Sequence, residues 1–174
     1  MLNKAVRLHG QNDLRLDTFE LPPIKDDEIL VKVMSDSICM STYKAAIQGS
    51  NHKRVPDYID THPAIVGHEF CGVIEQVGAK WQDRYKAGDK FTIQPAISYK
   101  DTMMTPGYAF EFCGGDSQRA VLLPEVMEQN CLLEYHANEY FYGSLSEPLS
   151  CIIGAFHAQY HTRPHVYVHD MGIR

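Results

Sequence analysis

Short segments separated by glycine and proline constrain the fold of this chain more than any other feature of its sequence. Apolar and polar residues alternate over residues 4–9, 14–20 and 28–35, and a turn signal, Gly10 to Asp13, lies between the first two segments. Alternation with a period of two is the pattern of a strand with one buried face. Many short strands joined in this way predict a mainly β fold with some α, a partly open antiparallel β-barrel with short helices.

Further elements are expected along the rest of the chain. The expected strands cover residues 69–77, 90–93 and 117–123, the expected helices residues 40–48 and 145–161, and the expected loops residues 51–63 and 96–115. Gly49 and Pro164 are expected to end the two helices. Gly72 lies inside an expected strand, where a glycine often marks a bulge or a close approach of two backbones.

Length, charge and hydropathy limit the class of protein. The chain has 174 residues, which fits one domain covering residues 1–174, and its 44% hydrophobic content is ordinary for a soluble globular protein. A formal charge of −6 argues against nucleic acid and anionic membranes as partners. No apolar run reaches the length of a membrane span, and residues 1–16 lack the apolar core of a signal peptide. We therefore expect a cytoplasmic protein.

The five cysteines do not predict a disulfide framework. Their number is odd and no C-x-x-C pair occurs. Reduced thiols fit a cytoplasmic protein, and a free cysteine is usually a small buried hydrophobe. Only Cys39 has a sequence context that points to another role.

That context is a set of possible metal ligands. Cys39, the pair His68-Glu69 and Glu147 supply one thiolate, one imidazole and two carboxylates. Such a set suits a catalytic zinc ion, which holds three or four protein groups and keeps a position for water or substrate. Taken singly, each residue has a more ordinary explanation: an isolated histidine is usually a surface or core residue, and Glu147-Pro148 a helix start. The joint pattern favours the metal site.

The pattern resembles the zinc-dependent medium-chain alcohol and polyol dehydrogenases over essentially the whole chain. GHEFCGVIEQVG matches the family signature G-H-E-x-x-G-x5-G, and the family's Gly-Asp turn follows at 88–89. Cys39 lies 29 residues before His68, and E-P-L at 147–149 matches the polyol branch. The resemblance implies a GroES-like catalytic domain in which residues 145–174 lead toward a nucleotide-binding domain. No G-x-G-x-x-G fingerprint occurs, so we expect the Rossmann domain to be absent from this chain.

The resemblance also implies metal ligands. Cys39, His68 and Glu69 would hold one catalytic zinc, with Glu147 as a further ligand or an exchangeable neighbour. Many family members hold a second, structural zinc with four closely spaced cysteines. The corresponding loop here has only Cys113, and one thiolate cannot make a tetrahedral structural site, so we expect no structural zinc.

Roles in proton transfer follow from the same resemblance. The family's hydroxyl two residues after the cysteine is Ser41, which would pass the substrate proton together with Lys44. Glu69 is expected to be a catalytic group as well as a ligand. Thr42 stands where many members have an aspartate that supports the zinc-bound histidine, so either another group orients that histidine here or the site is looser.

A basic segment lies close to these residues in the sequence. From Ser37 to Pro56 there is no acidic residue, although Lys44, Lys53 and Arg54 are present, along with His52. The segment is either a solvated loop or a site where Lys44, Lys53 and Arg54 hold a substrate phosphate.

The runs CMSTYKAAIQGSNHKRVPD and YFYGSLSEPLSCIIGAFHAQYH resemble a bacterial sugar-phosphate branch of the family. That branch implies interconversion of a ketose phosphate and a sugar-alcohol phosphate, with hydride from NAD(P)H bound on the missing domain. We expect the isolated chain to be inactive as a dehydrogenase, and the full-length enzyme to form a possible homo-oligomer.

Three other interpretations stay open. The first is another polyol or alcohol dehydrogenase of this family, and the second is a zinc-free quinone reductase. The third is a stand-alone GroES-like binding domain with a vestigial metal site. A quinone reductase would not need Cys39, His68 and Glu69 together, which disfavours it.

A different metal site is conceivable near the end of the chain. Histidine recurs every four residues there, at His157, His161, His165 and His169. Pro164 interrupts this repeat, and no glutamate stands in the H-E-x-x-H register of a helical zinc site. We interpret these residues as mostly surface histidines.

Overall fold

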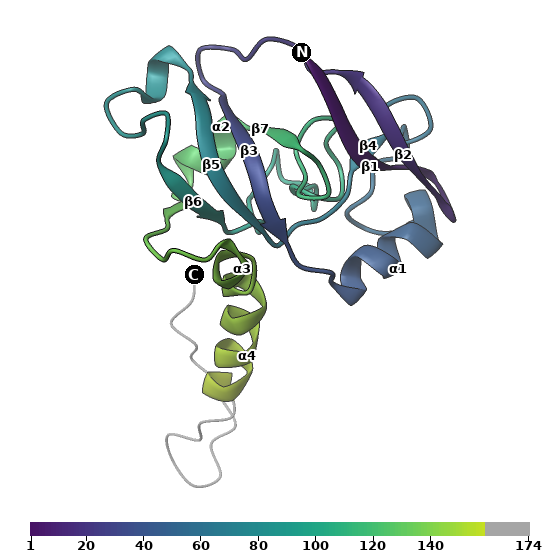
Figure 1. Cartoon of the computed structure of the whole chain (residues 1–174). Helices are drawn as coiled ribbons and strands as arrows, with labels where there is room; N and C mark the ends of the chain where they lie inside the picture. The colour runs from purple at the N-terminus through teal and green to yellow at the C-terminus, as the bar shows by residue number, and fades with distance from the viewer. Residues whose placement is uncertain (159–174) are drawn as a thin grey trace, which may run out of the picture.

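The computed structural model describes residues 1–158, which form two antiparallel sheets and a few helices (Figure 1). One sheet has the strand order β2-β1-β4 and the other β7-β3-β5-β6-β8. Their strands are β1 (Leu2–Gly10), β2 (Asp13–Glu20), β3 (Ile29–Asp36), β4 (Ala64–Ile65), β5 (Phe70–Val77), β6 (Lys90–Ile93), β7 (Arg119–Leu122) and β8 (Leu132–Glu134). The sheets stay open at their edge strands. The expected mainly β, partly open antiparallel architecture is confirmed.

The five-stranded sheet carries the main hydrophobic core. The apolar side chains of β3 and β5 alternate inward and pack with those of β6 and β7, which removes them from water. The core includes Ile29, Val31, Phe70, Ile74, Phe91 and Leu122. Gly72 lies opposite a register shift between Val33 and Ser35, and a methyl group there would fall on the Lys32 carbonyl oxygen. The expected bulge and close approach at Gly72 are confirmed.

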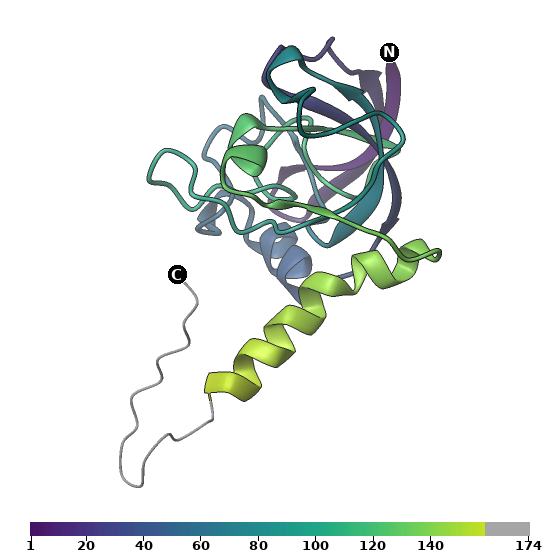
Figure 2. The same cartoon turned by 90° about the vertical axis from the view of Figure 1, so that its left-hand side faces the viewer.

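Helices connect the sheets and lead away from them. Helix α1 (Met40–Gln48) follows β3 and ends at Gly49, whose φ of 55° is the left-handed geometry that favours glycine. α3 (Tyr140–Ser144) packs beside β3 and β5, and α4 (Ser146–Ala158) then extends away from the sheets (Figures 1 and 2). The helix expected over residues 145–161 is therefore confirmed as far as Ala158. Its expected end at Pro164 lies outside the described residues.

Four short elements were not predicted. They are β4, β8, α3 and α2 (Pro124–Glu128). A strand of two or three residues carries too few positions to show alternation, and a helix of five residues shows no helical period. Pro124 follows the strand expected over residues 117–123 and occupies the first turn of α2, where its missing N–H costs nothing.

A tight turn at Gly67 joins β4 to β5 and presents the next two residues. Gly67 has a φ of 88°, and a methyl group there would fall on the Asp36 carboxylate. The Gly67 carbonyl accepts a hydrogen bond from the Gly115 N–H at 2.8 Å, and the Val66 carbonyl accepts one from Asp116 at 2.9 Å. Both the backbone conformation and the packing at this position therefore require glycine.

We expect Gly67→Ala to lower the free energy of unfolding by about 3 kcal/mol or more, since it adds a steric overlap to a strained φ. Gly88→Ala is the matched control: Gly88 has a φ of 95° but no atom within 4 Å of the added methyl group. It should cost only about 1 kcal/mol. Urea unfolding followed by circular dichroism measures both values. Equal losses would show that the packing around Gly67 is not the cause.

Candidate active site

Cys39 lies in the short connection between the end of β3 and the start of α1. It is the N-cap residue of α1, and its extended backbone (φ −99°, ψ 140°) turns the chain into the helix. The Sγ atom accepts a hydrogen bond from the Ser41 N–H at 3.4 Å. The sequence prediction of a strand-to-helix turn at Cys39 is confirmed.

His68 and Glu69 follow the Gly67 turn and are almost completely buried, with 6% and 5% of their surfaces exposed. Their side chains meet Cys39, and one ligand atom from each of the three residues lies within 4.8 Å of the others. His68 Nε2 and Glu69 Oε1 are 3.8 Å apart. Two ligands of a tetrahedral zinc are separated by roughly 3.5 Å, so this donor set fits zinc.

The imidazole of His68 is contacted at both nitrogens. Thr42 Oγ1 lies 3.4 Å from Nδ1, and the Tyr108 hydroxyl lies 3.3 Å from Nε2. Burial lowers the pKa of His68, an effect that the neighbouring Glu69 partly opposes. The ring is therefore kept in the neutral form that binds metals. Thr42, which stands where many family members have an aspartate, is therefore one of the two hydroxyl groups that contact this ring.

Glu69 is held by two neighbours from the end of β3. The Ser37 hydroxyl donates to its Oε2, and the Glu69 backbone N–H donates to Asp36 Oδ1 at 3.1 Å. Ser37 thus holds one carboxylate oxygen, Oε2, and the other, Oε1, faces the imidazole of His68.

Glu147 lies near this group but is not one of its three members. It belongs to the first turn of α4, and its Oε1 lies 3.4 Å from the Cys151 thiol. Burial raises the pKa of Glu147, as does its proximity to Glu69. The structure thus places Glu147 next to a candidate ligand.

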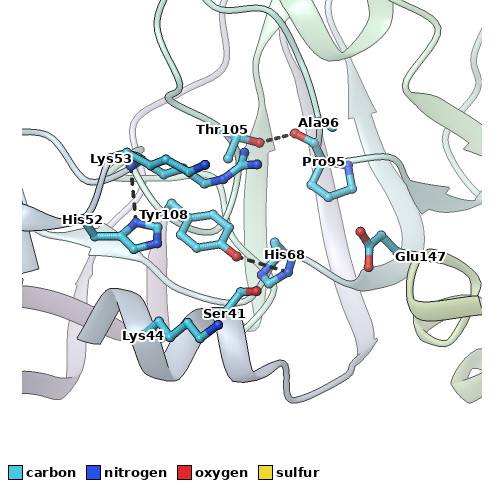
Figure 3. A pocket seen from close by; sticks show the side chains of 11 residues that line it. Ser41, Lys44, His52, Lys53, His68, Pro95, Ala96, Thr105, Tyr108 and Glu147 are labelled. Carbon is cyan, nitrogen blue, oxygen red and sulfur yellow. Dashed lines mark hydrogen bonds between the residues drawn. The ribbon is translucent and has the colours of Figure 1, made fainter. Parts of the chain in front are cut away.

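A pocket of about 340 Å³ opens from His68 toward the basic segment (Figure 3). Every residue that was predicted for proton transfer or phosphate binding, except the buried Glu69, contributes to its wall. The lining residues are Ser41, Lys44, His52, Lys53, Arg54, His68, Pro95, Ala96, Thr105, Tyr108 and Glu147. Glu147 lies on one side of His68 in Figure 3, and Lys44 and Lys53 lie on the other. The end of the pocket at the ligand candidate His68 is named the metal-binding end, and the end at Lys44, Lys53 and Arg54 the basic end.

Tyr108 and Thr105 are pocket residues that sequence reasoning did not find. They come from the long loop after β6, which the sequence marked only as a loop. Tyr108 is buried and lies beside Ser41 and His68 in Figure 3, and the Thr105 hydroxyl donates to the Pro95 carbonyl. No local pattern indicates that a loop folds back to a distant turn, so these contacts depend on tertiary structure alone.

Comparison with known proteins decides the family. Residues 25–171 match the model of the alcohol dehydrogenase GroES-like domain. The chain belongs to this family. It is 51% identical over 98% of its length to the L-sorbose 1-phosphate reductase of Klebsiella pneumoniae, and 50% identical over 98% to the mannitol-1-phosphate 5-dehydrogenase of Aliivibrio fischeri. It spans 42% and 40% of these two relatives.

Solved structures of alcohol dehydrogenases share the fold of this GroES-like chain. The 2R,3R-butanediol dehydrogenase of Bacillus subtilis superimposes with a TM-score of 0.74 at 25% identity, covering 91% of this chain and 48% of that one. The cobalt- and zinc-bound alcohol dehydrogenase of Pyrobaculum aerophilum gives a TM-score of 0.70 at 17% identity, covering 91% and 49%. Among the helices within residues 1–158, none is long and apolar enough to cross a membrane.

The four-residue histidine repeat cannot be placed in this GroES-like domain. The backbone of His157 lies in α4, whereas His161, His165 and His169 lie outside the described residues. Their interpretation as surface histidines stays a prediction, as does the expected absence of a structural zinc from the loop around Cys113.

A pair of buried carboxyl groups lies behind the Gly67 turn. Burial and the charge of Asp116 raise the pKa of Asp36 to about 8, and burial raises the pKa of Asp116 as well. An ionised Asp36 is therefore costly in the folded chain at neutral pH. In the unfolded chain its pKa returns to the ordinary value of 3.8. Between these two values the folded chain holds a proton that the unfolded chain releases.

We therefore expect the stability contributed by Asp36 to be fully present below about pH 4 and to be lost as the pH rises toward about 8. Asp36→Asn removes this titration and can still accept the Glu69 N–H. The variant should gain stability relative to the native chain between pH 4 and pH 8, by on the order of 1 kcal/mol or more. Chemical unfolding at several pH values, in the presence of a chelator, measures the difference. Asp57→Asn, at an exposed position, is the matched control for the removal of one carboxylate. A constant difference for Asp36→Asn would contradict the prediction.

Proposed function

We propose that this chain is the zinc- and substrate-binding part of an NAD(P)-linked sugar-phosphate reductase, of the kind represented by L-sorbose 1-phosphate reductase. The observation that carries the proposal is a pocket with a basic cluster at one end and His68 at the other, where His68 is grouped with the ligand candidates Cys39 and Glu69. The names of the two relatives near 50% identity, both of which refer to sugar phosphates, support this substrate class.

In this proposal Cys39, His68 and Glu69 bind one catalytic zinc, and Glu147 is an exchangeable neighbour. A bound zinc supplies Lewis-acid polarisation of the substrate carbonyl, and a reduced nicotinamide held by a further part of the protein supplies the hydride. The chain's own residues exclude water and orient the ligands. The buried carboxylate of Glu69 and the neutral imidazole of His68 supply a donor set that is ready to bind without a change of protonation in the imidazole.

Ser41 is the proposed route for the substrate proton. Its hydroxyl faces the pocket next to His68 and the Tyr108 hydroxyl, so it can donate to an oxygen bound at the metal-binding end (Figure 3). Lys44 lies one helical turn further along α1 and also lines the pocket. Ser41 and Lys44 therefore form a path along one face of the helix toward solvent.

Lys44, Lys53 and Arg54 are the proposed phosphate ligands. Two arguments favour this role over a solvated loop: all three line the pocket that contains His68, and Glu147 is the only acidic residue among its described lining residues. Arginine and lysine are the usual partners of phosphate oxygens.

Helix α4 is proposed to lead toward a nucleotide-binding domain, as the resemblance implies for residues 145–174. Its apolar side chains are exposed, among them Leu149, Ile152, Ile153 and Phe156. These side chains have no cover among the described residues. An exposed apolar face of a helix usually packs against another domain or another protein. The assignment of residues 1–174 to one GroES-like catalytic domain is part of this proposal.

Metal content tests the proposed zinc site. The purified chain should hold about one zinc, measured by mass spectrometry, and the double variant Cys39→Ser/His68→Ala should lose it, because two of three ligands are removed. His136→Ala is the matched control, since this histidine is exposed and outside the pocket. A double variant that kept its zinc would refute the site.

Activity tests the substrate class. We would join this chain to the segment of the Klebsiella pneumoniae reductase that lies beyond the aligned region, and follow NAD(P)H oxidation. The chimera should reduce a ketose phosphate with a kcat/KM at least about 100-fold above that for the unphosphorylated ketose. Arg54→Gln should lower kcat/KM about tenfold for the phosphate ester only, and Lys86→Gln, at an exposed lysine outside the pocket, should change neither value.

Other outcomes of these experiments identify the alternatives. Equal activity on both ketoses would indicate another polyol or alcohol dehydrogenase of this family. A zinc-bound, folded chimera that oxidises no nicotinamide with any polyol or ketose would favour a stand-alone binding domain.

A further inference from the structure

Tyr108 lies between the metal-binding end and the basic end of the pocket. Its hydroxyl lies 3.3 Å from His68 Nε2, and its ring centroid is 4.7 Å from that of the imidazole. On the other side, the ring of His52 stacks on it at 5.7 Å and 4°, and the Arg54 guanidinium carbon is 5.6 Å from its centroid. The Tyr108 hydroxyl thus contacts His68 at the metal-binding end, whereas its ring contacts His52 and Arg54 at the basic end (Figure 3).

His52 has a defined hydrogen-bonding state. Its Nδ1 accepts the Arg54 backbone N–H at 3.3 Å. A neutral imidazole has one acceptor nitrogen and one donor nitrogen, so the proton resides on Nε2. Burial lowers the pKa of His52, as do the charges of Arg54, Lys53 and Lys44. His52 therefore offers the pocket an N–H donor without needing a positive charge of its own.

The basic side chains differ in how firmly they are held. Lys44 and Lys53 are exposed and have long flexible stems, whereas Arg54 is half-buried over the face of Tyr108. An arginine stacked on an aromatic ring is restricted before a ligand binds, so less conformational entropy is lost on binding. The stack of His52, Tyr108 and Arg54 is therefore the part of the basic end whose side chains pack against one another.

We propose that His52 and Tyr108 are specificity-determining residues of the phosphate site: the Tyr108 ring fixes His52 and Arg54, and His52 Nε2–H donates a hydrogen bond to a phosphate oxygen. This inference rests on the proposed function, because it requires a phosphate at the basic end. It adds a neutral donor and an aromatic support to the three cations. It also separates the two parts of Tyr108, since phosphate binding should need the ring but not the hydroxyl.

Isothermal titration of the chain with inorganic phosphate tests this inference without any dehydrogenase activity. Tyr108→Phe keeps the ring and should change phosphate affinity less than about twofold. Tyr108→Leu removes the stack and should weaken binding about tenfold, as should His52→Phe, which keeps an aromatic ring but removes the donor; one hydrogen bond to a charged group corresponds to such a change. Circular dichroism checks the fold of each variant, and His52→Phe, at the half-buried end of the stack, keeps the test decisive if Tyr108→Leu unfolds.

Each outcome supports or overturns the inference. Native-like phosphate binding by Tyr108→Leu and His52→Phe would overturn it and leave the cationic phosphate site of the proposed function intact. Equal losses in Tyr108→Phe and Tyr108→Leu would assign the effect to the hydroxyl and overturn the role of the ring. A native chain that binds no phosphate would overturn both this inference and the phosphate part of the proposed function, although the zinc measurement would still stand.

Discussion

The packing of one glycine turn against one loop determines where the functional groups lie. The turn at Gly67 is bonded through its backbone to Gly115 and packs against the Asp36 carboxylate, and the same loop, after Pro106, brings Tyr108 to His68. These hydrogen bonds fix the direction in which the chain leaves the turn. His68 and Glu69 therefore leave it toward Cys39, which the start of α1 presents from the other side. The segments that carry Cys39, His68 and Tyr108 are far apart in the sequence. They meet because a glycine without a side chain lets the turn and the loop approach each other closely.

The charges around this contact are divided in space. Carboxyl groups lie behind the turn and on α4, whereas the cations lie on α1 and on the chain between α1 and β4. Burial raises the pKa of Asp36 and of Asp116, which favours their uncharged forms. These two groups therefore add less negative potential near Glu69 than two ionised carboxylates would. The pocket between the two groups is therefore polar at both ends but basic at only one of them.

The sequence contains most of this architecture because its signals are local. Alternating strands, the glycine in β5 and the glycine that ends α1 each depend on a few neighbouring residues, and all were predicted. The ligand candidates were found because a motif fixes their order. Tyr108 and the stacking of His52 were not found, since a loop of about twenty residues, 96–115, gives no indication of which side chain returns to the pocket. The sequence showed only that the family aspartate is replaced by Thr42, whereas the structure shows that the Thr42 hydroxyl contacts His68.

Thr42 also affects the charge near the pocket. A hydroxyl orients the imidazole through Nδ1 without adding a charge, whereas the aspartate of many family members would place another negative group a few ångströms from the pocket. A doubly charged ester approaching His68 would be repelled by that group, at an energy that falls only slowly with distance in a buried site. For the proposed sugar-phosphate substrate, the Thr42 hydroxyl therefore leaves the metal-binding end without the further negative charge that a carboxylate would add, so the attraction of the cations at the basic end would reach further into the pocket.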